Sequence, residues 1–277
     1  MTDFEDIPYR TIDGHTLEAR LYRPAGSGPD ISPDSGPARW VVDVHGGAWG
    51  SGDRLNNQVI HEDLAAHGIG VFALDFRLSD TAQYPAMVDD VSYGIRWFKA
   101  NAAALGVNAA TIGGLGSSSG AQQLGLVALC PANPRWTTPD AALGDADASI
   151  DFFVAGWPIL DPLARYRMVR DAGNERLVAA HDACFATEAD MAEGNPCALL
   201  DRGEATHLPP MIVIQGTADA NVEHTWQDRF ADLYRAKGGT VEMHKYDGQP
   251  HTFVTADPTS AASLDAIVKI REFVLAV

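Results

Sequence analysis

Nine residues from Gly114 to Gln122, GLGSSSGAQ, place three serines between glycines, after an apolar run and before a helix-like one. Within them, Gly116 to Gly120 match the pattern G-x-S-x-G with Ser118 at the centre. On such a tight strand-turn-helix, the central hydroxyl stands clear of the sheet, and the helix N-terminus favours developing negative charge. The pattern predicts that Ser118 is a nucleophile. A flexible Gly/Ser linker is the alternative interpretation of the same letters.

Two downstream residues have the types and places needed to activate this serine. A serine hydroxyl needs a base that accepts its proton and a third group that orients the base. After a nucleophile on a strand-turn-helix, the acid comes next in the chain and the histidine last. Asp219 follows the strand-like run MIVIQG, and His251 lies in a loop after the last strand pattern, in YDGQPHTF. We therefore predict a catalytic triad of Ser118, Asp219 and His251 at the carboxyl ends of strands.

Other acids and histidines compete for these roles. An aspartate after a strand, such as Asp219, is often only a turn or cap residue. Asp161, in PILDPL, is the rival acid. His224 opens a helix pattern and His244 lies inside a strand pattern, so neither fits the loop after the last strand. The chain also offers His207 and His181 as rival bases.

Acyl transfer also needs hydrogen-bond donors for an oxyanion. The stretch VDVHGGAWG ends a strand pattern and continues into glycines, which turn backbone N–H groups toward a substrate at little steric cost. We predict that the oxyanion hole is formed by this loop, at Gly46, Gly47 and Ala48, together with the N–H of Ser119. The sequence leaves open which N–H groups of the loop point inward. His45 is expected to brace the loop.

Two tryptophans are candidates for the substrate pocket. Trp49 ends the oxyanion motif, and Trp157 follows a strand-like run that precedes a long insert over residues 161–208. Bulky apolar rings narrow a pocket, so we expect a preference for short acyl chains. Three insert arginines, Arg165, Arg167 and Arg170, either roof this pocket or solvate a helix face.

The elements that position these residues alternate along the chain. A hairpin is expected around Asp13-Gly14, followed by a surface loop from Arg23 to Ala38. Strand patterns cover 40–47, 69–78, 109–116, 148–159, 209–220 and 240–246, and helix patterns cover 56–68, 86–106, 118–129, 224–239 and 263–276. This alternation predicts an α/β fold: a mostly parallel twisted sheet flanked by helices, in a single domain over 1–277.

One interval interrupts the alternation. Residues 161–208 separate two strand patterns and are mostly helical in pattern, whereas a plain crossover needs about a dozen residues. We expect a helical, cap-like insert before the penultimate strand. Extra scaffold is the alternative.

Together these motifs resemble the α/β-hydrolase superfamily. Within it they are similar to the serine-esterase branch of hormone-sensitive-lipase-like carboxylesterases, bacterial feruloyl and acetyl-xylan esterases, and kynurenine formamidases. The resemblance is carried by His45 to Trp49, Asp75 to Leu78, Gly116 to Gly120, Gly216 to Asp219, and Pro250-His251, and it spans about Val41 to Phe253. Ala48 stands where the lipase-like members have a third glycine, which favours the feruloyl-esterase and formamidase side.

This resemblance implies a serine carboxylesterase-type hydrolase that acts on a small ester, without metal or cofactor. An amidase or formamidase with the same triad is one alternative. A catalytically silent relative that serves as a binding protein is another. The identity of the acyl and alcohol groups is not implied.

Composition limits the partners. The 20 Lys and Arg against 37 Asp and Glu leave a formal charge of −17, so the basic footprint of a nucleic-acid-binding protein is absent. No run approaches the roughly 18 apolar residues of a membrane span. The acidic N-terminus without an apolar core favours a cytoplasmic protein. Cys184 and Cys197 pair only in an oxidising compartment, and free buried thiols are expected together with Cys130. The esterase branch also implies a homodimer as an option.

Overall fold

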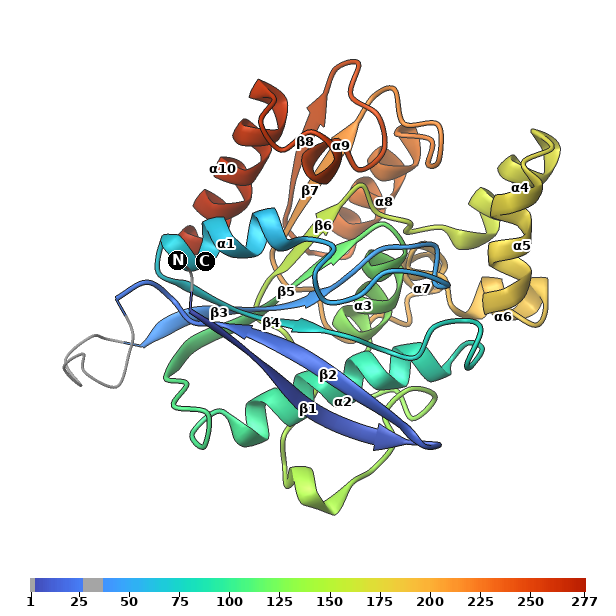
Figure 1. Ribbon diagram of the computed structural model, residues 1–277. Coiled ribbons are helices and arrows are strands. Elements are labelled where there is room, and N and C mark those ends of the chain that lie inside the picture. Colours follow the sequence, from blue (N-terminus) through green and yellow to red (C-terminus); the bar gives the residue numbers. More distant parts are fainter. Residues whose placement is uncertain (1–2, 27–36) are drawn as a thin grey trace.

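An eight-stranded, mostly parallel sheet forms the centre of the described chain (Figure 1). The computed structural model describes residues 3–26 and 37–277, so most of the loop expected from Arg23 to Ala38 lies outside the described residues. The strand order is β1-β2-β4-β3-β5-β6-β7-β8; β1 and β2 are antiparallel, and the strands from β4 to β8 are parallel. The strands are β1 (Phe4–Ile12), β2 (His15–Tyr22), β3 (Ala38–Val44), β4 (Ile69–Leu74), β5 (Ala109–Ser117), β6 (Phe153–Gly156), β7 (Met211–Gly216) and β8 (Val241–Tyr246).

The hairpin predicted at Asp13-Gly14 is confirmed. Both residues have positive φ, 51° and 81°, as a two-residue turn between twisted antiparallel strands requires. The hairpin adds two antiparallel strands to the edge of the parallel sheet.

Helices cover both faces of the sheet and create two apolar cores. Val41 and Val42, neighbours on β3, point to opposite faces, and each is buried in a different cluster. One face packs against α1 and α10, and the other against α2, α3, α7 and α8. The helices are α1 (Gln58–Ala66), α2 (Ala86–Asn101), α3 (Ser119–Leu129), α4 (Pro162–Asp171), α5 (Glu175–Cys184), α6 (Glu188–Glu193), α7 (Pro196–Arg202), α8 (Thr225–Ala236), α9 (Phe253–Ala256) and α10 (Ala261–Ala276), with a short 3₁₀ turn at Ala141–Leu143.

Several elements are shorter than the sequence patterns suggest, among them α2 and β6. Helix α2 ends at Asn101, and the expected end at Gly106 instead closes one further turn, in which the Val107 N–H donates to the Ala102 carbonyl at 2.8 Å. Gly106 has φ 68°, the left-handed conformation that ends a helical turn. Strand β6 covers only four residues, and it ends at Gly156 because Trp157, with φ 38°, turns the chain away from the sheet.

The interval between β6 and β7 contains α4, α5, α6 and α7. Each of these helices begins at a polar side chain that accepts a hydrogen bond from its first turn: Asp161, Asn174, Thr187 and Asn195. Figure 1 shows α4, α5 and α6 standing to one side of the sheet, beyond its carboxyl edge. The role of this insert as a cap stays a prediction.

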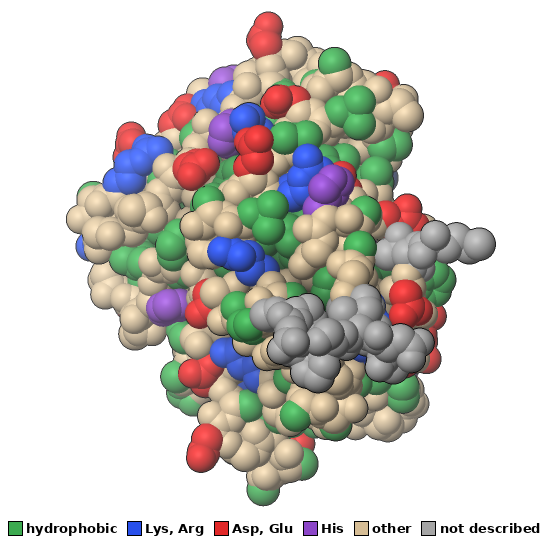
Figure 2. Space-filling model, turned by 90° about the vertical axis from the view of Figure 1, so that its left-hand side faces the viewer, with side chains coloured by type: hydrophobic (Ala, Val, Ile, Leu, Met, Phe, Trp, Pro, Cys, Tyr) green, Lys and Arg blue, Asp and Glu red, His purple; other side chains and the backbone are tan. Residues whose placement is uncertain are grey.

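Charged side chains are mixed on the surface. Figure 2 shows lysine and arginine side chains interspersed with acidic ones over one face, without a continuous basic area among the described residues in view. Within residues 3–26 and 37–277, no helix has the length and apolar character needed to cross a bilayer.

Candidate active site

Three side chains from separate loops meet at the carboxyl edge of the sheet. Ser118 lies between β5 and α3, Asp219 follows β7, and His251 follows β8. These strands are parallel, so the loops after them lie at one edge. The Oγ atom of Ser118 is 2.9 Å from Nε2 of His251, and Nδ1 of that ring is 2.7 Å from Oδ2 of Asp219. The structure therefore brings together the serine, acid and histidine that the sequence singles out.

The carboxyl group of Asp219 is fully buried and surrounded by donors. Its Oδ1 accepts hydrogen bonds from the N–H groups of Asn221 and Val222, at 2.8 and 2.9 Å. Its Oδ2 accepts one from Nε2 of Gln215 at 2.9 Å and also faces His251. Burial raises the pKa of Asp219, but the surrounding donors, His251 first, outweigh burial and hold this pKa below its usual value. The carboxylate is thus ionised beside the imidazole at neutral pH.

Ser118 lies on a strained turn that needs its flanking glycines. Its φ of 50° and ψ of −117° cost an L-residue on the order of 1–3 kcal/mol. A Cβ atom at Gly116 would lie 2.7 Å from the backbone of α3, and one at Gly120 would lie 2.0 Å from the carbonyl oxygen of Val44. Only glycine allows these approaches, which explains why the local sequence folds into this turn.

We expect Gly120→Ala to lower the free energy of unfolding by about 3 kcal/mol or more, because the new methyl group overlaps backbone that cannot rotate away. Urea unfolding followed by circular dichroism measures this loss. Gly156→Ala is the matched control, because its Cβ would meet Ser117 Cβ only at 3.8 Å, an ordinary contact. Similar losses for the two variants would contradict this account of the turn.

The loop after β3 lies beside this turn. Gly46, Gly47 and Ala48 line the same cavity as Ser118. Gly47 has φ +123°, and a Cβ there would lie 1.9 Å from the carbonyl oxygen of Ser51, so this position requires glycine. Ala48 also has positive φ, 51°. This loop thus places its backbone against the cavity.

Neighbouring groups hold the loop and the turn in place. The N–H of Ser118 donates to the Gly156 carbonyl at 2.9 Å, which leaves it unavailable to a substrate. Ser119 begins α3, and N–H groups in the first turn of a helix have no intrahelical acceptor. His45 stacks on Phe76, with ring centroids 4.3 Å apart, and its Nδ1 is 2.6 Å from the Gly46 carbonyl oxygen. Burial lowers the pKa of His45.

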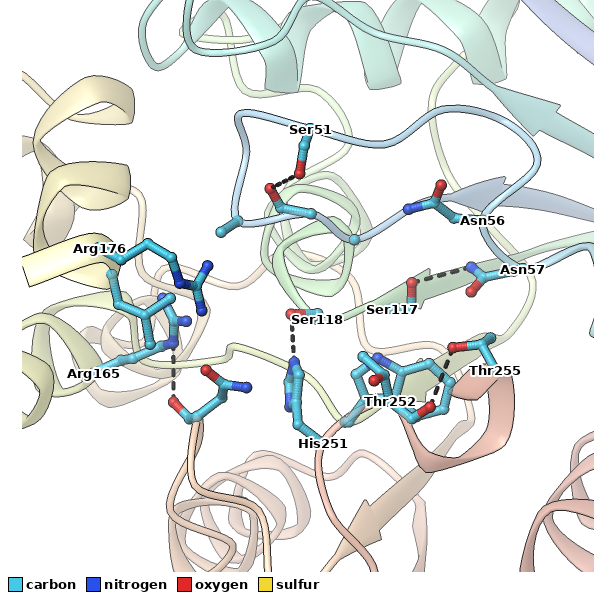
Figure 3. A pocket seen from close by; sticks show the side chains of 16 residues that line it. Ser51, Asn56, Asn57, Ser117, Ser118, Arg165, Arg176, His251, Thr252 and Thr255 are labelled. Carbon is cyan, nitrogen blue, oxygen red and sulfur yellow. Dashed lines mark hydrogen bonds between the residues drawn. The ribbon is translucent and has the colours of Figure 1, made fainter. Parts of the chain in front are cut away.

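A cavity of about 310 Å³ opens in front of Ser118 and His251 (Figure 3). Its lining is largely polar; among the described lining residues, only Ala48, Trp157 and Leu177 supply apolar side chains. The polar and charged lining residues other than Ser118 and His251 are Ser51, Asn56, Asn57, Ser117, Arg165, Arg176, Asn221, Thr252 and Thr255. Such a cavity suits a small, polar ligand better than a long hydrocarbon chain.

A family model described as BD-FAE matches residues 31–233, well over half of the chain. The chain belongs to the BD-FAE family. An ethyl acetate hydrolase from Pseudomonas putida is 26% identical to this BD-FAE protein over 274 residues, which cover 96% of this chain and 80% of the relative. Carboxylesterase NlhH from Mycobacterium tuberculosis is 29% identical over 269 residues, which cover 90% of this chain and 75% of the relative.

A solved structure shares the fold of the BD-FAE protein. It is a thermophilic esterase from Thermogutta terrifontis with bound propionate, with a TM-score of 0.77 and 24% sequence identity, and the match covers 98% of this chain and 93% of the esterase. The predicted α/β-hydrolase fold is confirmed. Together with the family match and the relatives, this fold identifies the BD-FAE protein as a hydrolase that belongs to the serine esterases of the α/β-hydrolase superfamily.

The rival acid and histidines of the BD-FAE protein have other partners. Asp161 caps α4 by accepting from the Ala164 N–H at 3.0 Å, and it also accepts from Asn195 Nδ2 at 2.7 Å. His181 is buried in the insert, and its Nδ1 faces the Leu177 carbonyl at 2.9 Å. The other three histidines also have partners through a ring nitrogen. His207 lies near the Ile150 carbonyl oxygen, and His224 lies near Nζ of Lys245. His244 lies near Oε2 of Glu242.

Trp49 of the BD-FAE protein lies elsewhere than the sequence suggests. It is fully buried and does not line the cavity; its Nε1 donates to Oε1 of Gln122 at 2.9 Å, and its ring packs edge-on against Phe185 of the insert. Gln122 Nε2 also donates to the Gly194 carbonyl at 2.7 Å. Trp49 thus connects the loop at Gly46, Gly47 and Ala48 to α3 and the insert. Trp157, in contrast, lines the cavity.

The arginines of the insert lie in two places, the cavity and the outer surface. Arg165 lines the cavity, whereas Arg167 and Arg170 are exposed and pair with Glu188. Arg176, in α5, also lines the cavity, although no sequence pattern predicts this place. No local motif marks Arg176, because its place depends on how the insert folds back over the sheet edge. The described residues bring no three His, Cys, Asp or Glu side chains together as a metal site.

Proposed function

We propose that this chain hydrolyses small carboxylic esters through an acyl-enzyme formed on Ser118. The observation that carries the proposal is the hydrogen-bonded series from Ser118 through His251 to Asp219, at the wall of a cavity. Membership of the BD-FAE family and the named ester hydrolases among its relatives support the same reaction. The chemistry needs no metal ion, since nucleophile, base and donors are all supplied by the chain.

In the first half of the reaction, Ser118 Oγ attacks the ester carbonyl while His251 Nε2 accepts its proton. Asp219 holds the Nδ1–H side of the ring and balances the charge of the imidazolium. The tetrahedral intermediate collapses when the imidazolium gives its proton to the leaving alcohol, which leaves the acyl group on Ser118.

The negative oxygen of the intermediate needs fixed donors. We assign this role to N–H groups of the loop at Gly46, Gly47 and Ala48, together with the N–H of Ser119. The placement of that loop along the cavity and of Ser119 at the start of α3 supports the assignment. In the second half of the reaction, water attacks the acyl group, and His251 serves as base again.

A fluorophosphonate probe tests the proposal directly, because it labels only a serine that is activated as a nucleophile. Labelling at Ser118, found by peptide mass spectrometry, together with hydrolysis of p-nitrophenyl acetate, is the expected result. A chain that is neither labelled nor active is the silent binding relative. An amidase or formamidase has the same triad, and a matched ester and amide of one acyl group separates it from an esterase.

We expect the enzyme to prefer acyl chains of roughly two to four carbons, because the cavity is small and polar and Trp157 forms part of its wall. Trp157→Ala should raise kcat/KM on p-nitrophenyl octanoate and lower it on the acetate. Each contact that changes should alter the activation free energy by about 1–3 kcal/mol. The measurement is kcat/KM on acetate, butyrate and octanoate.

Trp157→Phe serves as the milder variant, since truncating a buried tryptophan to alanine also costs about 3–5 kcal/mol of stability. It should shift the profile in the same direction by less. The idea fails if the unmodified enzyme is most active on octanoate, or if neither variant changes the profile.

We also propose a cytoplasmic location. The three cysteines, Cys130, Cys184 and Cys197, are free and buried, which suits a reducing compartment. Cell fractionation tests this location. Pairing of two chains stays a prediction, which light scattering after gel filtration tests.

A further inference from the structure

Two arginines from the insert face the cavity beside Ser118. Arg165 belongs to α4 and Arg176 to α5, and both line the cavity. Figure 3 shows their guanidinium groups together on one side of Ser118, whereas Asn56 and Asn57 lie on the other side. The insert therefore gives one half of the cavity a cationic wall.

Arg165 lines the cavity, and its side chain is held by two hydrogen bonds and a ring contact. Its side chain is buried, with the residue only 2% exposed. Nε donates to the Asn221 carbonyl at 3.1 Å, and Nη1 donates to Nε2 of His181 at 3.4 Å. The ring of Trp49 lies 5.8 Å from the guanidinium carbon. Within the described part of the chain these hydrogen bonds use Nε and Nη1, and none uses Nη2.

Neither arginine has a carboxylate partner among the described residues, although most arginines of the chain do. Asp219 interacts with Arg165 through space, but both oxygens of Asp219 already accept other hydrogen bonds. Arg176 is exposed and makes no ion pair or hydrogen bond within the described residues. A buried cation without an anion is costly, and burial lowers the pKa of Arg165 to about 10.

A purely structural role explains one contact of Arg165, because its hydrogen bond to the Asn221 carbonyl connects α4 to the loop after Asp219. It does not account for Arg176, which touches no partner there. Arg167, on the same insert, shows the usual arrangement of a surface arginine: it points outward and pairs with Glu188. The two cavity arginines are thus available to an anion that comes from outside the chain.

We propose that the substrate of this hydrolase carries a free carboxylate, which Arg165 and Arg176 bind while the ester carbonyl lies at Ser118. The proposal rests on the ester hydrolysis proposed above and adds the class of ester. A guanidinium offers paired N–H donors that match the two oxygens of a carboxylate. The formal charge of −17 disfavours anionic ligands generally, so recognition of one requires such a local cationic wall.

Matched neutral substrates test the proposal. Ethyl hydrogen glutarate carries the carboxylate on the acyl side, and its neutral match is ethyl 4-carbamoylbutanoate. Acetoxyacetate carries the carboxylate on the alcohol side, and its match is acetoxyacetamide. We expect kcat/KM, followed by acid release in a pH-stat, to favour the carboxylate by roughly 10- to 100-fold in one of the two pairs. The pair that shows the preference assigns the arginines to the acyl or the alcohol side.

Arg176→Gln should remove most of this preference, so that kcat/KM falls far more on the carboxylate than on the carboxamide. Arg167→Gln removes an arginine of the same insert that faces away from the cavity, and it should leave the preference unchanged. Equal kcat/KM within both pairs for the unmodified enzyme overturns the proposal, as does a preference that survives Arg176→Gln.

Ligand binding to a variant that lacks the Ser118 hydroxyl tests carboxylate recognition separately from ester hydrolysis. In the Ser118→Ala variant, ethyl hydrogen glutarate or acetoxyacetate should raise the melting temperature more than its carboxamide, and Arg176→Gln should abolish the difference. An enzyme that cleaves p-nitrophenyl acetate but shows no carboxylate preference refutes only the present inference. A chain that cleaves no ester refutes the proposed function, and the melting shift still decides whether the arginines bind a carboxylate.

Discussion

Ser118→Ala is expected to abolish ester hydrolysis and leave the fold unchanged, with kcat lower by on the order of 10⁶-fold. In the proposed mechanism the hydroxyl is the attacking group, and among residues 3–26 and 37–277 its Oγ makes a hydrogen bond only to His251. Alanine keeps the same Cβ at the same strained φ, so the turn and the melting temperature should stay as they are. A p-nitrophenyl acetate assay and a thermal melt measure the two quantities.

The neighbouring serines provide the controls. Ser117 Oγ accepts a hydrogen bond from Asn57 Nδ2 at 3.0 Å, and Ser119 Oγ accepts one from the Trp49 N–H at 3.2 Å. Ser117→Ala and Ser119→Ala each remove one of these hydrogen bonds. They should therefore lower kcat by much less than Ser118→Ala does. An active Ser118→Ala variant, with an inactive variant at either neighbour, means that the nucleophile has been assigned to the wrong residue.

Asp219→Asn should lower kcat by about 10⁴-fold with little change in KM. The Asn Oδ1 can still accept from the two backbone N–H groups, but its NH₂ then faces two donors, Gln215 Nε2 and the Nδ1–H of His251. The imidazole is pushed into the other tautomer, in which Nε2 carries the proton and cannot accept one from Ser118. Steady-state kinetics on one short ester measure the effect.

Asp161→Asn is the matched control for this change. Asp161 caps α4, and asparagine is an equally good cap, so activity should change little. The reverse ranking of Asp219→Asn and Asp161→Asn assigns the acid of the triad to Asp161.

The lowered pKa of Asp219 adds a stability test to this comparison. Because the unfolded chain binds a proton to this carboxyl at a higher pH than the folded chain, Asp219 stabilises the fold above its unfolded pKa. This contribution is lost as pH falls through the folded pKa. The free energy of unfolding of Asp219→Asn should therefore fall less over the same acid range than that of the unmodified chain.

The sequence determines the fold class and singles out three residues of the candidate triad, because each of these features has a local signal. The alternation of strand and helix patterns follows from the periods at which side chains repeat on each element. Ser118 is marked by glycines that the tight turn requires, since a Cβ at Gly116 or Gly120 would overlap backbone. Asp219 and His251 are marked by their places directly after strands, and parallel strands bring those places together.

Tertiary structure alone decides which side chains face the cavity. Trp49 directly follows the loop proposed to form the oxyanion hole, but Gln122 and Phe185, far along the chain, hold its ring away from the cavity. Arg165 and Arg176 have no distinguishing neighbours in sequence. They reach the cavity because α4 and α5 fold beyond the carboxyl edge of the sheet. A local pattern specifies the period and the turn, whereas the direction of one side chain depends on packing partners that only the folded chain supplies.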